Sequence, residues 1–174
     1  MKINEGELIS LLIYQISSLY GITKYLGTNL HHVKVHGALY NMASEDDQIA
    51  RLIVNTVSEI DPNLKIYGPS MLKWKIIAEE GGLEYVSEVF SDRNYNEDLT
   101  LVDRKNQNAI INNKDLGVEH VMRMVKQNKV KTINGNYKEI KAQTVCIHGD
   151  QKLSLIHISE PTRQAEMSYA VICL

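Results

Sequence analysis

The sequence is poor in cysteine, proline, phenylalanine and tryptophan. Its 174 residues include two Cys, three Pro, one Phe and one Trp. Cys146 and Cys173 form neither a CxxC motif nor a disulfide framework, and no His/Cys cluster has zinc-finger spacing. These absences exclude a disulfide-stapled secreted scaffold and a zinc finger. With 44% hydrophobic residues, the chain has enough apolar side chains for one domain with its own core.

An excess of charge of one sign is also missing. The formal net charge is -2, the pI is near 6.3, and Lys and Arg are scattered along the chain. There is thus no electrostatic reason to expect binding to nucleic acid or to an anionic membrane. No apolar run reaches the roughly 18 residues of a membrane span, and the start MKINEGELIS does not resemble a secretory signal. We expect a cytoplasmic protein.

The spacing of apolar residues predicts helices that alternate with strands. We expect helices at residues 5–26, 44–60, 70–80 and 114–127, and strands at 32–36, 64–67, 83–90 and 144–147. The polar stretch 94–113 is expected to be a long loop, and 131–141 a small hairpin. This alternation indicates a parallel sheet with right-handed crossovers. Periodicity alone does not distinguish a closed β/α barrel from an open doubly wound sheet.

Local signals refine three of these elements. Ser44 is expected to cap the second helix. The strand at 144–147 is expected to be buried, because its residues are almost all apolar. The last helix is expected to turn four residues toward the core: Leu116, Val121, Met124 and Val125.

Ionisable side chains lie at the ends of three of the predicted strands. They are Lys34 and His36 at the first, Glu88, Asp92 and Arg93 at the third, and His148 and Asp150 at the last. The carboxyl ends of parallel strands lie on one side of a sheet, and ligands bind there. We therefore expect these side chains to gather around one pocket.

Each of these residues, taken alone, also has a structural interpretation. Lys34 is compatible with a solvated strand residue, and His36 with a hydrogen-bonded structural histidine. Asp92 and Arg93 are compatible with a loop ion pair, and Asp150 with a helix cap. Their joint placement at strand ends favours a functional role. The sequence has no Walker loop, no GxGxxG and no GxSxG motif, so a bound nucleotide would use neither glycine-rich loop.

Residues 153–174 do not continue the alternation. They read LSLIHISEPTRQAEMSYAVICL, which resembles the conceptual translation of a sequencing adapter around an index barcode. We therefore expect a domain at residues 1–152 and exclude 153–174 from functional reasoning.

Five segments of the sequence resemble the LamB/YcsF family. They are LIYQISSL (12–19), HHVKVHGALYNMA (31–43), SEVFSDRNYNEDLTLVDRK (87–105), VMRMVKQNKVKTINGN (121–136) and VCIHGD (145–150). The resemblance implies a (β/α) barrel of the glycoside hydrolase/deacetylase type, incomplete in this chain. An Asp-Leu-Asn-Cys-Asp-type motif and a further histidine segment of the family are missing here, and Val35 stands where the family usually has proline.

The activity implied by the family is that of the A subunit of bacterial ATP-dependent 5-oxoprolinase. That enzyme hydrolyses the lactam of 5-oxo-L-proline to L-glutamate, with ATP as co-substrate and subunits B and C as partners. Such chemistry needs cations for phosphate and oxyanion charge, and acid/base groups for water and the leaving nitrogen. We expect acid/base roles for His36, Glu88, His148 and Asp150. We expect substrate or phosphate contacts from Lys34, Asp92, Arg93, Tyr95 and Asn96.

Two alternatives remain open at this stage. One is a metal-dependent deacetylase or other carbohydrate hydrolase, in which His36, His148 and Asp150 hold a divalent metal. The other is a scaffold subunit whose partners carry the chemistry. We expect the chain as printed to be inactive by itself, because barrel strands of the family are missing from it.

Overall fold

The computed structural model describes residues 4–148, so Asp150 and the segment 153–174 lie outside the described residues. The helices are α1 (Glu5–Tyr25), α2 (Gly37–Glu45), α3 (Asp47–Ile60), α4 (Leu72–Glu80) and α5 (Lys114–Gln127). The strands are β1 (His32–Val33), β2 (Lys65–Pro69), β3 (Glu84–Phe90), β4 (Lys129–Lys131), β5 (Tyr137–Glu139) and β6 (Thr144–Cys146).

The main sheet has the order β1-β2-β3-β6, and all neighbouring strands in it are parallel. The predicted parallel sheet is therefore confirmed. A second, antiparallel pair is formed by β4 and β5, which is the hairpin expected after the last helix. Asn128 joins α5 to this hairpin in the left-handed conformation, with φ 52°.

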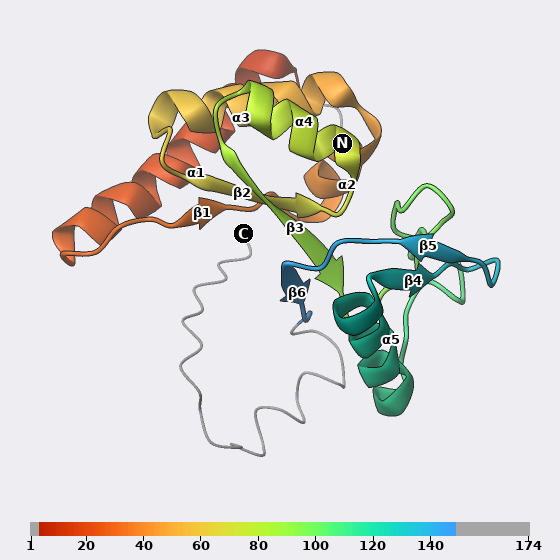
Figure 1. Cartoon of the computed structure of the whole chain (residues 1–174). Helices are drawn as coiled ribbons and strands as arrows, with labels where there is room; N and C mark the ends of the chain where they lie inside the picture. Colours follow the sequence, from red (N-terminus) through yellow and green to blue (C-terminus); the bar gives the residue numbers. More distant parts are fainter. Residues whose placement is uncertain (1–3, 149–174) are drawn as a thin grey trace.

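Helices α1, α3 and α4 lie together on one side of β1–β3, whereas α5 and the hairpin lie at the other end of β3 (Figure 1). The apolar residues of α3 recur at helical spacing and form the centre of the core, where Ile53, Val54 and Val57 are almost completely buried. Trp74 of α4 and Val89 of β3 pack in the same core. The opposite face of the sheet carries Glu88 and Phe90 of β3, which lie two residues apart and therefore on the same side of the strand.

One contact shows that the sheet is curled. The strands β1 and β6 are three strand intervals apart, which is about 14 Å in a flat sheet. Lys34 directly follows β1, yet its Nζ lies 3.2 Å from Cys146 Sγ on β6. The sheet therefore bends around these side chains and forms half of a barrel, with the polar residues on the concave side.

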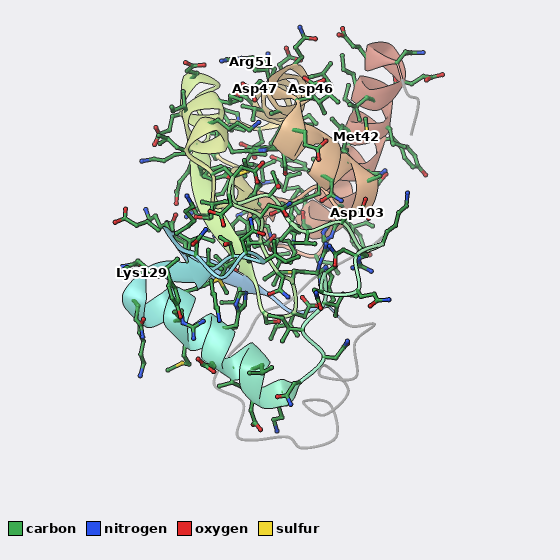
Figure 2. All side chains as sticks on the ribbon, turned by 90° about the vertical axis from the view of Figure 1, so that its right-hand side faces the viewer. Met42, Asp46, Asp47, Arg51, Asp103 and Lys129 are labelled. Carbon is green, nitrogen blue, oxygen red and sulfur yellow. The ribbon has the colours of Figure 1, made fainter. Side chains whose placement is uncertain are left out.

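The predicted cap at Ser44 is wrong. Ser44 lies inside α2, where its hydroxyl donates to the Tyr40 carbonyl oxygen at 2.7 Å. Asp46 caps α3 instead and accepts from the Gln48 N–H at 2.8 Å. Figure 2 shows Asp46 and Asp47 at this junction. The short helix α2 was missed, because Gly37 ends an alternating stretch and so predicts a turn; in the structure it opens α2 with φ 60°.

Two burial predictions also fail. Leu116 and Val125 of α5 are 57% and 49% exposed, because the helix buries Gly117, His120 and Met124 against β4 and β3 instead. The strand at 144–147 is only half-buried. The reason is that β6 is an edge strand among the described residues, paired with β3 alone.

Candidate active site at the carboxyl ends of the strands

A buried ion pair connects the ends of β1 and β3. Lys34 Nζ lies 2.5 Å from Glu88 Oε1, and the two side chains are 13% and 4% exposed. Burial disfavours the charge on Lys34, but Glu88 and Cys146 outweigh that effect and raise the pKa of Lys34. Burial raises the pKa of Glu88, and Lys34 opposes this shift. The site therefore holds a fixed ammonium group whose counter-ion is fixed as well.

A second pair joins the segment after β3 to the segment after β6. His148 Nδ1 lies 3.0 and 2.9 Å from the two carboxylate oxygens of Asp92, which is 2% exposed. A carboxylate only accepts hydrogen bonds, so Nδ1 carries a proton and donates it. In the neutral imidazole, Nε2 is then the basic nitrogen. This is the orientation that a general base requires.

The Phe90 ring lies between the two pairs. His148 stacks on it at 5.4 Å with an interplanar angle of 20°, and Lys34 Nζ lies 5.4 Å from the ring centroid. Tyr40 of α2 packs edge-on against the same ring at 5.5 Å. One aromatic side chain thus fixes the positions of groups from β1, α2 and the segment after β6.

His36 occupies the position before the first residue of α2, and its side chain makes no capping hydrogen bond there. Burial lowers the pKa of His36, and the charges of Lys34 and His148 lower it further. His36 is therefore neutral at neutral pH. The electrostatic influence of Lys34 and His148 means that the imidazole belongs to the same cluster.

A cleft of about 290 Å³ adjoins these residues. It lies between α2, the ends of β2 and β3, and the loop after β3, and Asp103 of that loop lies beneath α2 in Figure 2. Arg93 lines it and is 5% exposed; its Nη2 donates to the Val102 carbonyl oxygen at 2.6 Å. Glu88 lines the cleft as well, so the cleft and the ion pair share a carboxylate.

Tyr95 and Asn96 are placed differently from the other predicted site residues. Tyr95 lines the cleft but is 3% exposed, and its hydroxyl accepts from the Phe90 N–H at 2.9 Å. Asn96 Nδ2 donates to Thr100 Oγ1 at 2.9 Å and does not line the cleft. Both side chains thus stabilise the loop that covers the cleft.

The structure therefore brings Lys34, His36, Glu88, Asp92 and His148 into one cluster, with Arg93 in the adjoining cleft. Asp150 lies outside the described residues. Sequence reasoning missed Tyr40, Cys146 and Arg104. For Tyr40 the sequence contains a signal: Tyr40 and Ala43 are three residues apart, which is the spacing of one helix face. In the structure both are buried in α2.

Residues 4–148 contain no group of three or more His, Cys, Asp or Glu side chains that is arranged to hold a metal ion. The metal site suggested by the sequence consists of His36, His148 and Asp150, and Asp150 lies outside this range. None of the helices described is long and apolar enough to cross a membrane.

A curled parallel sheet with polar pairs at the carboxyl ends of its strands defines an α/β protein of the β/α-barrel class. Within this class the chain belongs to the LamB/YcsF family, whose sequence model matches residues 1–170. The family resemblance of the sequence is thereby confirmed.

Known relatives agree with this assignment. The chain is 42% identical over 160 residues to the 5-oxoprolinase A subunit of Alkaliphilus metalliredigens, covering 92% of this chain and 62% of that protein. It is 37% identical to the 5-oxoprolinase A subunit of Campylobacter jejuni, covering 99% of this chain and 68% of the relative. The crystal structure of a lactam utilization protein from Thermus thermophilus superimposes with a TM-score of 0.78 at 33% identity, covering 85% of this chain and 60% of that one. The chain thus spans less than two thirds of the Alkaliphilus and Thermus proteins.

Proposed function

We propose that this chain forms the site-bearing part of the A subunit of an ATP-dependent 5-oxoprolinase. The reaction is hydrolysis of the lactam of 5-oxo-L-proline to L-glutamate, with ATP cleaved to ADP and phosphate. The observation that supports it most is the convergence of the Lys34–Glu88 and Asp92–His148 pairs on Phe90. This convergence occurs in a chain that is 42% identical to a protein named as the 5-oxoprolinase A subunit.

The chemistry explains why both pairs are needed. A lactam carbonyl is a poor electrophile, and transfer of the γ-phosphoryl group of ATP to its oxygen activates the carbon. Water then adds to that carbon, and the ring C–N bond breaks while the nitrogen takes up a proton, which leaves the acyl phosphate of glutamate. A second water molecule hydrolyses this acyl phosphate to the carboxylate and phosphate. Negative charge develops on oxygen and a proton moves from water to nitrogen, so the site needs a cation and an acid/base pair.

The residues of this chain supply these functions. Lys34, held in place by Glu88, stabilises the negative charge that develops on the lactam oxygen. His148, oriented by Asp92, accepts a proton from water through Nε2. His36 is neutral and lies in the same cluster, so we assign it the relay of that proton: it accepts the proton from the imidazolium of His148, passes it to the leaving nitrogen and returns to the neutral form. Asp150 keeps its proposed acid/base role, two residues beyond His148 in the chain.

The proposal includes partners and a co-substrate. The name of the relatives designates one subunit of a larger enzyme, so we propose that subunits B and C act together with this chain. ATP is the co-substrate, and a divalent ion that accompanies its phosphates is part of the proposal. We place the reaction in the cytoplasm, where ATP is available.

The test is a chimera in which residues 1–152 replace the matching segment of the Alkaliphilus metalliredigens relative. With its partner subunits, the chimera is expected to form glutamate from 5-oxo-L-proline in an ATP-dependent reaction, with the unaltered relative as control. No turnover by a folded chimera would contradict the proposal. Full turnover by the partner subunits alone would indicate a scaffold role. Activity lost on chelation and restored by zinc, but not by magnesium, would favour the metal-dependent hydrolase.

A further inference from the structure

Helix α5 exposes a stripe of apolar side chains. Val118, Met122 and Val125 recur at steps of four and three residues, which places them on one side of the helix. They are 40–56% exposed, because α5 packs against β4 and β3 with a different side. An exposed apolar patch that polar residues surround marks a site where another molecule binds.

Basic residues gather next to this stripe, although they form no continuous run in the sequence. Residues 121–141 contain six Lys or Arg and one acidic residue, whereas the whole chain has a net charge of -2. Two of the six are paired: Arg123 with Glu119, and Lys138 with Glu97 at 3.3 Å. The other four form no ion pair with a side chain of residues 4–148. They are Lys126, Lys129, Lys131 and Lys141.

The helix and the hairpin form one continuous surface. In β4, Lys129 and Lys131 lie on the exposed face, because the residue between them is buried on the other side. Tyr137 of β5 pairs with Lys131 in the register, and the Arg123 guanidinium of α5 lies 5.4 Å from the centroid of the Tyr137 ring. Figure 2 shows Lys129 at one end of α5, on the outside of the molecule.

This surface joins the apolar stripe to the lysines. Lys126 follows Met122 by one helical turn, and Tyr137 is 57% exposed. We call it the α5–hairpin surface. It consists of Met122, Val125, Lys126, Lys129, Lys131 and Tyr137.

The charge of this surface calls for an acidic partner, and two kinds of acidic partner fit poorly. A second copy of this chain has acidic helices, but Asp47 is already paired with Lys73 at 3.1 Å, and Glu80 with Arg51 at 2.6 Å. Docking would have to break these pairs. A nucleic acid would match the lysines but would leave the apolar side chains without a contact. A protein that carries both acidic and apolar side chains matches the whole surface.

We propose that the α5–hairpin surface is the docking site for a partner subunit that presents apolar side chains within an acidic rim. The inference rests on the multi-subunit enzyme proposed above. Met122 and Tyr137 form the centre of the contact, since Met and aromatic residues are enriched in interface cores. Lys126, Lys129 and Lys131 lie at the rim, where they attract the acidic partner and set its orientation.

Hydrogen bonds connect this docking site to the candidate active site. The Ile133 N–H of the hairpin turn donates to the Tyr95 carbonyl oxygen at 2.8 Å, and Thr132 Oγ1 donates to Glu97 Oε1 at 2.5 Å. Tyr95 lines the cleft, and Glu97 belongs to the loop that covers it. A subunit bound to the hairpin therefore lies next to the loop of the candidate active site.

The experiment measures binding of the chimera described above to the partner subunits of the Alkaliphilus metalliredigens relative, by biolayer interferometry at low and high salt. Lys126→Glu/Lys131→Glu should bind about tenfold more weakly or worse at low salt, mainly through slower association, and its affinity should depend less on salt. Met122→Gln should bind about fivefold more weakly or worse at both salt concentrations, because it removes a central apolar contact.

Lys24→Glu/Lys75→Glu is the matched control. It makes the same change of charge at exposed positions on α1 and α4, away from the α5–hairpin surface, and should bind like the unsubstituted chimera. All variants change exposed or half-exposed side chains, so their melting temperatures should stay within about 4 °C of the unsubstituted chimera. Equal binding by Lys126→Glu/Lys131→Glu and the unsubstituted chimera, or no binding by the latter, would overturn the proposal.

Other occupants of the surface would be recognised in the same series. Binding of a single-stranded oligonucleotide that only Lys126→Glu/Lys131→Glu loses, with unchanged binding of the subunits, would assign the surface to nucleic acid and overturn the proposal. Self-association of the full chain that this variant abolishes, again with unchanged subunit binding, would assign it to a second copy and overturn it as well. The proposed function fails separately, if the subunits bind as described but no ATP-dependent turnover follows.

Discussion

The ammonium group of Lys34 lies 2.5 Å from Glu88 Oε1, and so links β1 to β3 across β2, which lies between them. The same ammonium contacts Cys146 of β6 at 3.2 Å. A single side chain thus contacts two further strands on the concave face. This relationship ties the site to the curvature of the sheet, since both contacts depend on the half-barrel shape.

The first prediction concerns this ion pair. Lys34→Met leaves the buried Glu88 carboxylate without its counter-ion and is expected to lower the free energy of unfolding by about 3 kcal/mol. The double variant Lys34→Met/Glu88→Leu removes both charges and should recover most of this loss. Urea denaturation of the wild type, both single variants and the double variant measures the coupling. A double variant as unstable as the sum of the single variants would contradict the prediction.

The second prediction concerns the pH dependence of stability. Burial lowers the pKa of His120 from its ordinary value of 6.5 to about 4 in the folded chain. Above pH 6.5 the residue is neutral in both states, and its folded environment carries no penalty. Between pH 6.5 and 4 the unfolded chain binds a proton that the folded chain does not. As the pH is lowered from 6.5 to 4, the free energy of unfolding should therefore fall by roughly 1–3 kcal/mol because of this group.

His120→Phe tests the assignment, because it keeps an aromatic ring beside Tyr95 and cannot titrate. The free energy of unfolding is measured at pH 7.5 and pH 4.5, and the difference between these values should shrink in the variant. The same change at the exposed His31 is the control and should leave the difference as it is. An unchanged pH dependence in His120→Phe would rule out His120 as its source.

Much of the fold could be predicted because long elements carry a clear period. Helix α5 begins and ends at the predicted residues 114 and 127, and β3 differs from its prediction by one residue. The convergence of Lys34, Glu88 and His148 follows from the rule that parallel strands end at the same side of a sheet. The partners within the cluster were beyond prediction. That Lys34 contacts both Glu88 and Cys146 depends on the curl of the sheet, which no local pattern encodes.

Short elements are harder to predict, because they contain too few residues to show a clear period. Helix α2 has nine residues and begins with a glycine in the left-handed region, so its period is too brief and its first residue is atypical. Tyr40 was therefore not recognised as a site residue. The burial of Leu116 and Val125 was predicted from the helix alone, but burial depends on which neighbours pack against the helix.

The third prediction concerns Cys146. Burial raises the pKa of this thiol to about 11, with Glu88 adding to the shift and Lys34 opposing it. Since the thiolate is the reactive form, Cys146 should react with a disulfide reagent at pH 8 on the order of 100-fold more slowly than a free cysteine. The measurement uses Cys173→Ser, so that only one thiol remains, and urea-unfolded protein as the control. A native rate close to the unfolded rate would contradict the buried, protonated state.

The last prediction concerns Asp92 as a positioning residue. In Asp92→Asn, the amide group no longer requires a proton on His148 Nδ1 and can itself donate to that nitrogen, which moves the proton to Nε2. Nε2 then cannot accept a proton from water. In the chimera assembled with its partners, kcat should fall by about 10²-fold or more while KM changes little, because the substrate contacts remain. Asp115→Asn, at an exposed residue in the first turn of α5, is the matched control and should keep both values. A rise in KM with unchanged kcat would instead assign Asp92 to substrate binding, and it would remove His148 from its role as the oriented base.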